Sequence, residues 1–191
     1  LLGRMAAQAQ KYGALIENGT VAKLVRQDGS FYASVDNRVI RARTVLLATG
    51  VVDKPPELPE VRQAVERGLI RYCGICDAYE VIDRKVAVIG HGRSGLGEAL
   101  FLRNYTVDIT LLTLGQALEL EPDEWRQVEK AGIRVIEEPV TIVVESNQVR
   151  ALVGREGQEY AFDALYSALG SEARSHLACR LGASTDERGC V

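Results

Sequence analysis

The sequence predicts an α/β fold: a three-layer domain with a parallel sheet, helices on one face and a β meander on the other, plus an incomplete second domain. Residues 86–89, Val-Ala-Val-Ile, form the short, continuous apolar run that is typical of a strand buried in a parallel sheet. This run leads through closely spaced glycines into residues 96–102, which favour a helix. Three short apolar segments within residues 140–162, separated by turn residues, predict three further strands.

The N-terminal part of the chain predicts one helix and then a β meander. Residues 1–12 are mostly helix formers, and Gly13 is a suitable C-cap. Residues 21–26 and 30–35 flank an Asp-Gly dipeptide, which strongly favours a hairpin. Two further strands are expected, over residues 37–42 and 44–48.

A proline cluster separates this part from the rest of the chain. Pro55, Pro56 and Pro59 lie within five residues and indicate a linker or a domain crossing. Beyond them, residues 61–68 predict a short helix. The remaining elements are strands over residues 108–113, 133–136, 140–145, 149–153, 159–162 and 163–169, helices over 122–131 and 171–179, and turns that contain Asn147, Gly154 and Gly157.

The composition excludes several classes of protein. With 47% hydrophobic and 26% charged residues, the 191-residue chain has the composition of an ordinary globular protein. Its net charge of −3 gives no reason to expect a nucleic acid or an anionic membrane surface as a partner. No apolar run approaches the roughly 20 residues that cross a bilayer. The four cysteines are too few for a disulfide scaffold, so we predict a cytoplasmic protein. The chain begins within a helix and stops at Val191, and we expect it to be a piece of a longer polypeptide.

Two closely spaced cysteines, Cys73 and Cys76, form the motif around which the chain is organised. If a helix begins here, its dipole stabilises the thiolate, the form that attacks a disulfide. Asp77 follows directly, where a carboxyl can exchange a proton with a thiolate, or can serve only to stabilise the helix N-terminus. Two inert thiols are a further alternative. Zinc is disfavoured because it needs four ligands, and Cys179 and Cys190 do not form a second such motif. We predict a redox pair and no metal site.

A glycine-rich hexapeptide over residues 90–95 links the predicted buried strand to its helix. In this setting, backbone N–H groups and a helix N-terminus face a pyrophosphate. The alternative is a tight strand–helix turn that binds no nicotinamide, with its His and Arg solvated. A dithiol motif this close to a dinucleotide loop suggests electron transfer. The candidate cofactor-binding residues are Gly90, His91, Gly92, Arg93, Ser94 and Gly95.

The order of the motifs along the chain resembles that of a known family. A helix and meander, Ala48-Thr49-Gly50 and a proline-marked crossing come first; Cys-Gly-Ile-Cys-Asp at residues 73–77, the glycine loop and Ala168-Leu169-Gly170 follow. This order resembles that of the low-molecular-weight thioredoxin reductases, within the pyridine nucleotide–disulfide oxidoreductases. The resemblance covers essentially the whole chain, and its most specific part is the cysteine motif just before the glycine loop.

The resemblance implies an FAD/NAD(P)-binding, Rossmann-like fold in which a nicotinamide domain interrupts an FAD domain. Residues 1–51 would be the latter part of the first FAD segment, residues 52–169 the nicotinamide domain, and residues 170–191 the start of the returning FAD segment. What remains of the FAD site would be Ala48, Thr49 and Gly50.

The same resemblance implies a flavin-dependent disulfide oxidoreductase. Electrons would pass from NAD(P)H to FAD and then to the Cys73–Cys76 pair. Cys76 would face the flavin, Cys73 would attack the disulfide of the partner, and Asp77 would be the acid/base. The partner would be a thioredoxin-like protein or a small disulfide or dithiol substrate. We expect a homodimer, and we expect this part of the chain alone to be inactive.

One position departs from the family pattern. NADPH-using members carry a His-Arg-Arg type motif after the second strand of the nicotinamide domain, and its guanidinium groups pair with the 2′-phosphate. Here the position is Leu112-Thr113-Leu114-Gly115, without a basic residue or a nearby carboxylate for a ribose 2′-hydroxyl. Thr113 is the residue expected to face the cofactor there. Two alternatives therefore stay open: a flavin-dependent dithiol oxidase that does not use nicotinamide, and a non-catalytic nucleotide-binding module.

Overall fold

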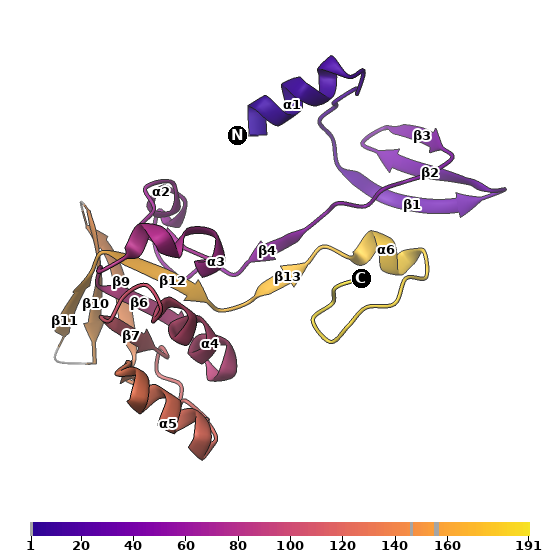
Figure 1. Cartoon of the computed structure of the whole chain (residues 1–191). Coiled ribbons are helices and arrows are strands. Elements are labelled where there is room, and N and C mark those ends of the chain that lie inside the picture. Colours follow the sequence, from indigo (N-terminus) through magenta and orange to yellow (C-terminus); the bar gives the residue numbers. More distant parts are fainter. Residues whose placement is uncertain (1, 146, 155–156) are drawn as a thin grey trace. The chain divides into compact units, whose positions relative to one another are not determined.

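The computed structural model describes residues 2–145, 147–154 and 157–191 (Figure 1). Leu1, the first residue of the predicted N-terminal helix, and residues 155–156 of a predicted turn lie outside the described residues. The chain divides into two compact units. The first comprises Leu1–Val51 and Ala173–Val191, and the second comprises Val52–Glu172.

The second unit is built on a five-stranded parallel sheet. Its central strand β6 is buried along its whole length, as the apolar run predicts. Each neighbouring pair in the sheet runs parallel. In spatial order the strands are β5 (Ile70–Arg71), β12 (Ala164–Ala168), β6 (Val86–Gly90), β7 (Ile109–Leu112) and β8 (Arg134–Ile136).

The two faces of the parallel sheet are buried against different layers. Val86, Val88 and Tyr166 belong to one apolar cluster, which also includes residues of the two long helices. Ala87 and Ile89 belong to a second cluster, because side chains along a strand alternate between faces. The covering helices are α4 (Gly92–Leu102) and α5 (Pro122–Ala131). The other layer is an antiparallel meander of β9 (Val140–Glu145), β10 (Gln148–Val153) and β11 (Gln158–Phe162), with α2 (Val61–Glu66) also contributing to that cluster. The predicted three-layer α/β fold is confirmed.

Helix α5 shows how closely local sequence signals set its ends. Pro122 occupies its first turn, and Glu121 and Glu124 form a reciprocal capping box. Gly132 ends the helix in the left-handed conformation, with φ 66°. The helix therefore begins and ends where the sequence predicts.

A contact between two glycines sets the approach of α4 to the sheet. A Cβ on Gly95 would lie 2.7 Å from the carbonyl carbon of Gly90, and a Cβ on Gly90 would lie 2.6 Å from the Cα of Gly95. Neither position accepts a side chain without movement of the backbone. The glycines thus bring the helix directly onto the end of β6.

The first unit contains a three-stranded antiparallel sheet and two helices. Asp28 and Gly29 both have positive φ, 47° and 71°, as the predicted tight hairpin requires. Strands β4 and β13 pair with each other, and the boundary between the two units falls within both strands. The elements are α1 (Leu2–Lys11), β1 (Val21–Gln27), β2 (Ser30–Val35), β3 (Arg38–Ala42), β4 (Val51–Asp53), β13 (Ser171–Ala173) and α6 (His176–Arg180).

Two sequence-based expectations are wrong. Residues 44–48 belong to none of the sheets, and Leu46 is exposed. An apolar run forms a strand only when another strand pairs with it, and none in the described part of the chain does. Residues 171–179 are not one helix, because residues 171–173 pair with β4, a distant partner that local sequence cannot reveal. Within the described residues, no helix is long and apolar enough to span a membrane.

We expect Gly95→Ala to destabilise the chain by about 1–3 kcal/mol, because the added methyl group would overlap the backbone of Gly90. Gly97→Ala, on the same helix, is the matched control. Nothing lies within 4 Å of its added Cβ, so this variant should gain about 0.5–1 kcal/mol. Urea denaturation measures both free energies of unfolding. Equal stability of the two variants would contradict the close packing of the glycines.

Candidate active site

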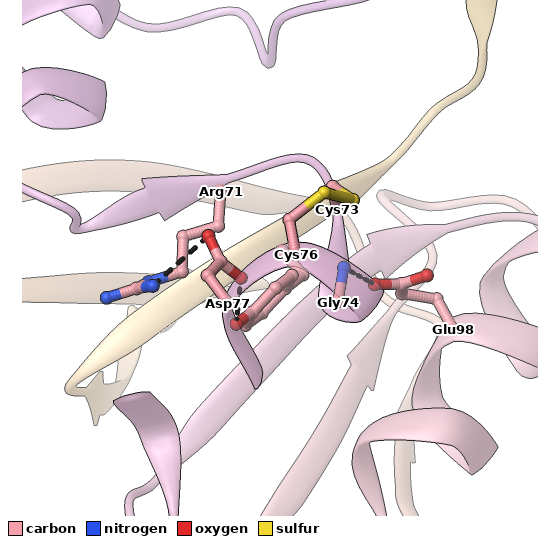
Figure 2. The surroundings of a disulfide bond; sticks show 7 residues. Arg71, Cys73, Gly74, Cys76, Asp77 and Glu98 are labelled. Carbon is pink, nitrogen blue, oxygen red and sulfur yellow. Dashed lines mark hydrogen bonds and ion pairs between the residues drawn. A yellow bond between two sulfur atoms is a disulfide. The ribbon is translucent and has the colours of Figure 1, made fainter. Parts of the chain in front are cut away.

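The cysteine motif forms an exposed turn directly after strand β5. Cys73 is the N-cap of the one-turn helix α3 (Gly74–Asp77), which continues into the 3-10 helix η1 (Ala78–Val81). A disulfide joins Cys73 to Cys76, with 5.3 Å between their Cα atoms (Figure 2). Cys76 is exposed, and Ile75 between the two cysteines is 85% exposed. The sulfurs are therefore within reach of a reacting partner, as thiol–disulfide exchange requires.

A glutamate of helix α4 holds one side of this turn. The Gly74 N–H donates to Glu98 Oε1 at 3.0 Å, and Figure 2 shows Glu98 directed at this amide. A Cβ on Gly74 would lie 2.7 Å from the same oxygen and 3.0 Å from Phe101 Cδ1. Burial raises the pKa of Glu98, and the charge of Asp77 adds to this effect, whereas the Gly74 N–H opposes it. The Glu98 carboxyl therefore stays protonated to a higher pH than an exposed glutamate does.

The other side of the turn is held through Asp77. Its Oδ1 accepts a hydrogen bond of 2.7 Å from the Tyr166 hydroxyl, and its Oδ2 lies 3.1 Å from Arg71 Nη1. Arg71 also pairs with Glu80 at 2.9 Å and donates from Nε to the Gly68 carbonyl at 2.9 Å. One guanidinium thus joins the turn before β5, helix α3 and η1. Figure 2 shows the Asp77 carboxylate turned toward Arg71, on the opposite side of the turn from Glu98.

The two partners of Asp77 keep their protons. Burial is the main cause that raises the pKa of Tyr166, and its hydrogen bond to Asp77 raises it further, so the hydroxyl stays a donor. Burial opposes the charge of Arg71, yet Glu80 and Asp77 outweigh it and the pKa of Arg71 rises. The Asp77 carboxylate therefore faces a permanent positive charge and a permanent hydrogen-bond donor.

The glycine loop lies at the end of β6, as predicted. Gly92 has φ 49° and open space where a side chain would be, so a ligand can approach its backbone closely. Ser94 Oγ lies 3.4 Å from the Ala168 carbonyl of β12. Arg93 is exposed and pairs with Glu124 of α5 at 2.8 Å. The loop thus has the geometry of a phosphate-binding turn, although its guanidinium already has a partner.

A crevice of about 610 Å³ opens beside this loop. It lies at the ends of β6, β7 and β12, where the chain crosses from one side of β6 to the other, the usual ligand position in an α/β sheet. His91 Nδ1 is buried and has no hydrogen-bond partner among the described residues. This unpaired nitrogen and the open backbone at Gly92 fit a polar ligand such as a nicotinamide dinucleotide. The lining residues include Lys54, Ile89, His91, Leu114 and Leu169.

The turn after β7 is closed by its own hydrogen bonds. Thr113 is fully buried, and its hydroxyl donates to the Gln116 carbonyl, so it does not line the crevice. The Leu118 N–H donates to the carboxylate of Glu137. Residues 113–121 contain glutamates but no Lys or Arg. The turn therefore offers no positive charge to a 2′-phosphate.

The remaining predicted residues lie in the first unit. Ala48, Thr49 and Gly50 line a cavity of about 380 Å³. Thr49 Oγ1 donates to the Arg174 carbonyl at 2.6 Å, and Gly50 has φ 64°. Cys179 and Cys190 are free, exposed thiols.

The sequence predicts the cysteines and Asp77 as site residues, but it does not predict the side chains that contact this turn. Arg71 stands two positions before Cys73, and a charge so close to a redox motif was a usable signal. Tyr166 is a polar-tipped residue within an apolar strand, and such a hydroxyl usually needs a partner. Nothing local in the sequence points to Glu98.

Comparisons with known proteins found a matching family profile and several similar proteins. A family profile described as "Pyridine nucleotide-disulphide oxidoreductase" matches residues 5–191. A thioredoxin reductase of Aquifex aeolicus (strain VF5) is 29% identical over 131 residues, which cover 68% of this chain and 40% of that protein. One of Streptomyces coelicolor is 31% identical over 113 residues, covering 59% and 35%. The chain thus spans less than half the length of either relative.

Solved structures show the same fold. The structure titled HlmI has a TM-score of 0.86 and 28% identity, covering 98% of this chain and 60% of that one. A thioredoxin reductase from Streptococcus pyogenes MGAS5005 also has a TM-score of 0.86, at 20% identity, covering 98% and 63%. At that identity, the second likeness concerns the fold alone.

We expect Glu98→Gln to become more stable relative to the unmodified chain as the pH rises. The pKa of Glu98 is higher in the folded state than in the unfolded state. Protonation of this carboxyl therefore contributes its full stabilisation only at pH values below the unfolded-state pKa, and this contribution is lost as the pH rises through the folded-state pKa. Glutamine keeps the acceptor for Gly74 but carries no charge. Thermal unfolding at pH 4 and pH 8 measures the difference. Glu129→Gln, on an exposed part of α5, is the control and should show no such trend. A constant difference in melting temperature for Glu98→Gln would contradict the burial of this carboxyl.

Proposed function

Since the chain belongs to the pyridine nucleotide-disulphide oxidoreductase family, we propose that its parent is an FAD-dependent disulfide oxidoreductase of the thioredoxin reductase type. It passes electrons from NAD(P)H through the flavin to the Cys73–Cys76 disulfide, and from there to a disulfide of a protein or a small molecule. The observation that carries the proposal is the exposed disulfide on a one-turn helix, flanked by two carboxyl groups in different environments.

The cysteines exchange two electrons and two protons with the partner. The Cys73 thiolate attacks the partner's disulfide, that S–S bond breaks, and the leaving sulfur takes the electron pair and a proton. Cys76 then attacks the Cys73 sulfur of the mixed disulfide, closes the ring and releases the second partner thiol. Asp77 is the proposed acid/base for these proton transfers.

The cofactors would be held by different parts of the chain. The glycine loop, His91 and the crevice beside them suit a nicotinamide dinucleotide. Ala48, Thr49 and Gly50 would contribute to the flavin site, within residues 1–51 and 170–191 as the FAD segments. When bound, FAD supplies the two-electron transfer between nicotinamide and Cys76.

The exposed side chains around the disulfide suit a protein or small organic partner. Ile75 and Tyr79, on either side of Cys76, are 85% and 78% exposed. A thioredoxin-like protein or a small disulfide could cover these apolar groups as it reaches the sulfurs. The parent would work as a homodimer in the cytoplasm.

A second candidate is a flavin-dependent dithiol oxidase that passes electrons to oxygen. The turn after β7 favours it, because residues 113–121 provide no cation for the 2′-phosphate of NADPH. In that case the same cysteines accept electrons from a dithiol instead of giving them to a disulfide.

We expect the full-length protein to be yellow, and its flavin absorbance to bleach anaerobically on addition of NADH or NADPH. Visible spectroscopy follows the bleaching. Cys73→Ser should keep the bleaching but reduce turnover of the disulfide substrate to background, because the attacking thiolate is lost. Bleaching by a dithiol alone, with oxygen consumed on exposure to air, would identify the dithiol oxidase instead. A colourless protein would exclude both.

We expect any nicotinamide binding to distinguish NADPH from NADH by less than about tenfold. A guanidinium–phosphate contact is worth about 1.5–3 kcal/mol, or roughly tenfold and more in affinity, and residues 113–121 provide no such group. Calorimetric titration of both cofactors measures the ratio. A preference for NADPH of a hundredfold would show that another part of the parent binds the phosphate.

A further inference from the structure

We infer that Glu98 is a positioning residue for the Cys73–Cys76 pair: by accepting the Gly74 N–H, it holds the backbone between the two cysteines on helix α4 and favours the closed disulfide over the open dithiol. This inference rests on the proposed function, in which the pair opens and closes in each reaction cycle. It assigns a role to a side chain that lies outside the cysteine motif, on the helix that begins in the glycine loop.

The cysteine turn is a weak structural element by itself. Helix α3 is a single turn of four residues, and a helix this short is unstable without packing against other elements. Its first residue is Gly74, and glycine is the residue type that loses the most backbone freedom on folding. Cys73 is the N-cap, but its sulfur is bonded to Cys76 instead of capping the helix. The turn therefore depends on contacts from outside it.

Glu98 provides the cap of α3 from another helix. The first N–H groups of a helix have no partner within the helix itself. The Gly74 N–H donates to Glu98 Oε1 at 3.0 Å (Figure 2). This N–H belongs to the peptide bond between Cys73 and Gly74, which lies inside the ring that the disulfide closes. The hydrogen bond therefore restrains the same part of the backbone that must be ordered for the two sulfurs to meet.

Gly74 lies directly on one face of α4. It is buried, and a Cβ at this position would come to 2.7 Å from Glu98 Oε1, 3.0 Å from Phe101 Cδ1 and 3.3 Å from Leu102 Cδ2. These three residues follow the spacing i, i+3 and i+4, so they are neighbours on the helix surface. The Glu98 carboxyl is thus the polar group of a contact face that is otherwise apolar.

The contact does not depend on the charge of Glu98. A carboxyl oxygen can accept an N–H whether the group is protonated or ionised. Burial raises the pKa of Glu98, and the hydrogen bond from Gly74 opposes that rise. The turn therefore requires an acceptor at position 98, which a side-chain amide also provides. This requirement distinguishes a positioning residue from an acid or a base.

An acceptor at this place favours ring closure because closure costs conformational freedom. In the open dithiol the backbone of residues 73–76 can leave the conformation in which the sulfurs meet, and closing the ring removes that freedom. If Glu98 restrains Gly74 in the dithiol as well, less freedom is lost when the ring closes. The effective concentration of one cysteine at the other rises, and the disulfide becomes harder to reduce.

Equilibration with glutathione measures this preference. Two glutathione thiols reduce the Cys73–Cys76 disulfide: its S–S bond breaks, two electrons and two protons pass to the cysteines, and one S–S bond forms in oxidised glutathione. The full chain is equilibrated at neutral pH with mixtures of both forms, quenched with acid and alkylated. Trypsin releases both cysteines in one peptide, residues 72–84, separate from Cys179 and Cys190, so mass spectrometry of this peptide reports the pair alone.

We expect Glu98→Met to lower the equilibrium constant for disulfide formation by about fivefold, the usual effect of losing a helix cap, because it removes the acceptor and keeps a long side chain. Glu98→Gln keeps an acceptor, so its constant should match that of the unmodified chain. Glu98→Asp draws the carboxyl back by one methylene. Its constant should also fall, so this variant remains informative if Glu98→Met does not fold. Glu129→Met, at an exposed position of α5, is the matched control and should leave the constant unchanged.

Urea denaturation of the oxidised and the reduced chain separates positioning from a general loss of stability. If Glu98 favours ring closure, Glu98→Met must destabilise the oxidised chain more than the reduced chain, because the two unfolding equilibria and the two redox equilibria form a closed cycle. Equal destabilisation of both forms would show that the contact supports the fold without favouring the disulfide, and would overturn the inference.

The outcomes also separate this inference from the proposed function. If the pair of the unmodified chain does not exchange with glutathione, the redox pair of the proposed function is lost together with the inference. If the pair exchanges but Glu98→Met matches the unmodified chain, or Glu98→Gln falls as far as Glu98→Met, the inference is overturned alone. A lower constant in Glu98→Met and Glu98→Asp, with Glu98→Gln and the control unchanged, supports the assignment.

Discussion

The site depends on the contact between Gly90 and Gly95. Because neither glycine has a side chain, helix α4 can lie directly on the end of β6. From that position its next turns reach the cysteine motif: Glu98 accepts the Gly74 N–H, and Phe101 packs against the same glycine. The loop that suits a dinucleotide and the turn that carries the disulfide are thus built on two ends of one helix. A shift of α4 would disturb both.

Much of the fold can be predicted from the sequence, because its signals are local. The continuous apolar run Val86–Ile89 anticipates a strand with two buried faces, and the Pro and Gly at the ends of α5 anticipate its bounds. The strand expected at residues 44–48 and the helix expected at 171–179 fail for one reason. Whether a short segment becomes a strand depends on the strand that pairs with it, and pairing over a long stretch of chain leaves no local signal.

The candidate site also combines residues that local sequence motifs predict with residues that only the structure reveals. The cysteine spacing and the glycine spacing are chemical motifs, and each predicts a part of the site by itself. Glu98 and Tyr166 reach the motif from α4 and β12, so only the folded chain brings them there, whereas Arg71 stands two positions before Cys73. Thr113 shows the opposite case: a residue chosen for its place in the sequence is used by the fold to close a turn.

The thiol–disulfide exchange proposed for this turn would be reversible, and the geometry of the cysteines does not by itself favour one direction. Under the proposed function, Asp77 serves as the acid/base both when a cysteine thiol is deprotonated to attack a partner disulfide and when an incoming dithiol is deprotonated. In the proposed enzyme, the direction would therefore be set by what exchanges electrons with the flavin. Within this chain, the part that bears on that choice is the turn after β7, because residues 113–121 contain no Lys or Arg to pair with a 2′-phosphate. The proposed cysteine chemistry is common to a reductase and an oxidase, and the difference between them would lie in whether the crevice beside the glycine loop binds a nicotinamide dinucleotide.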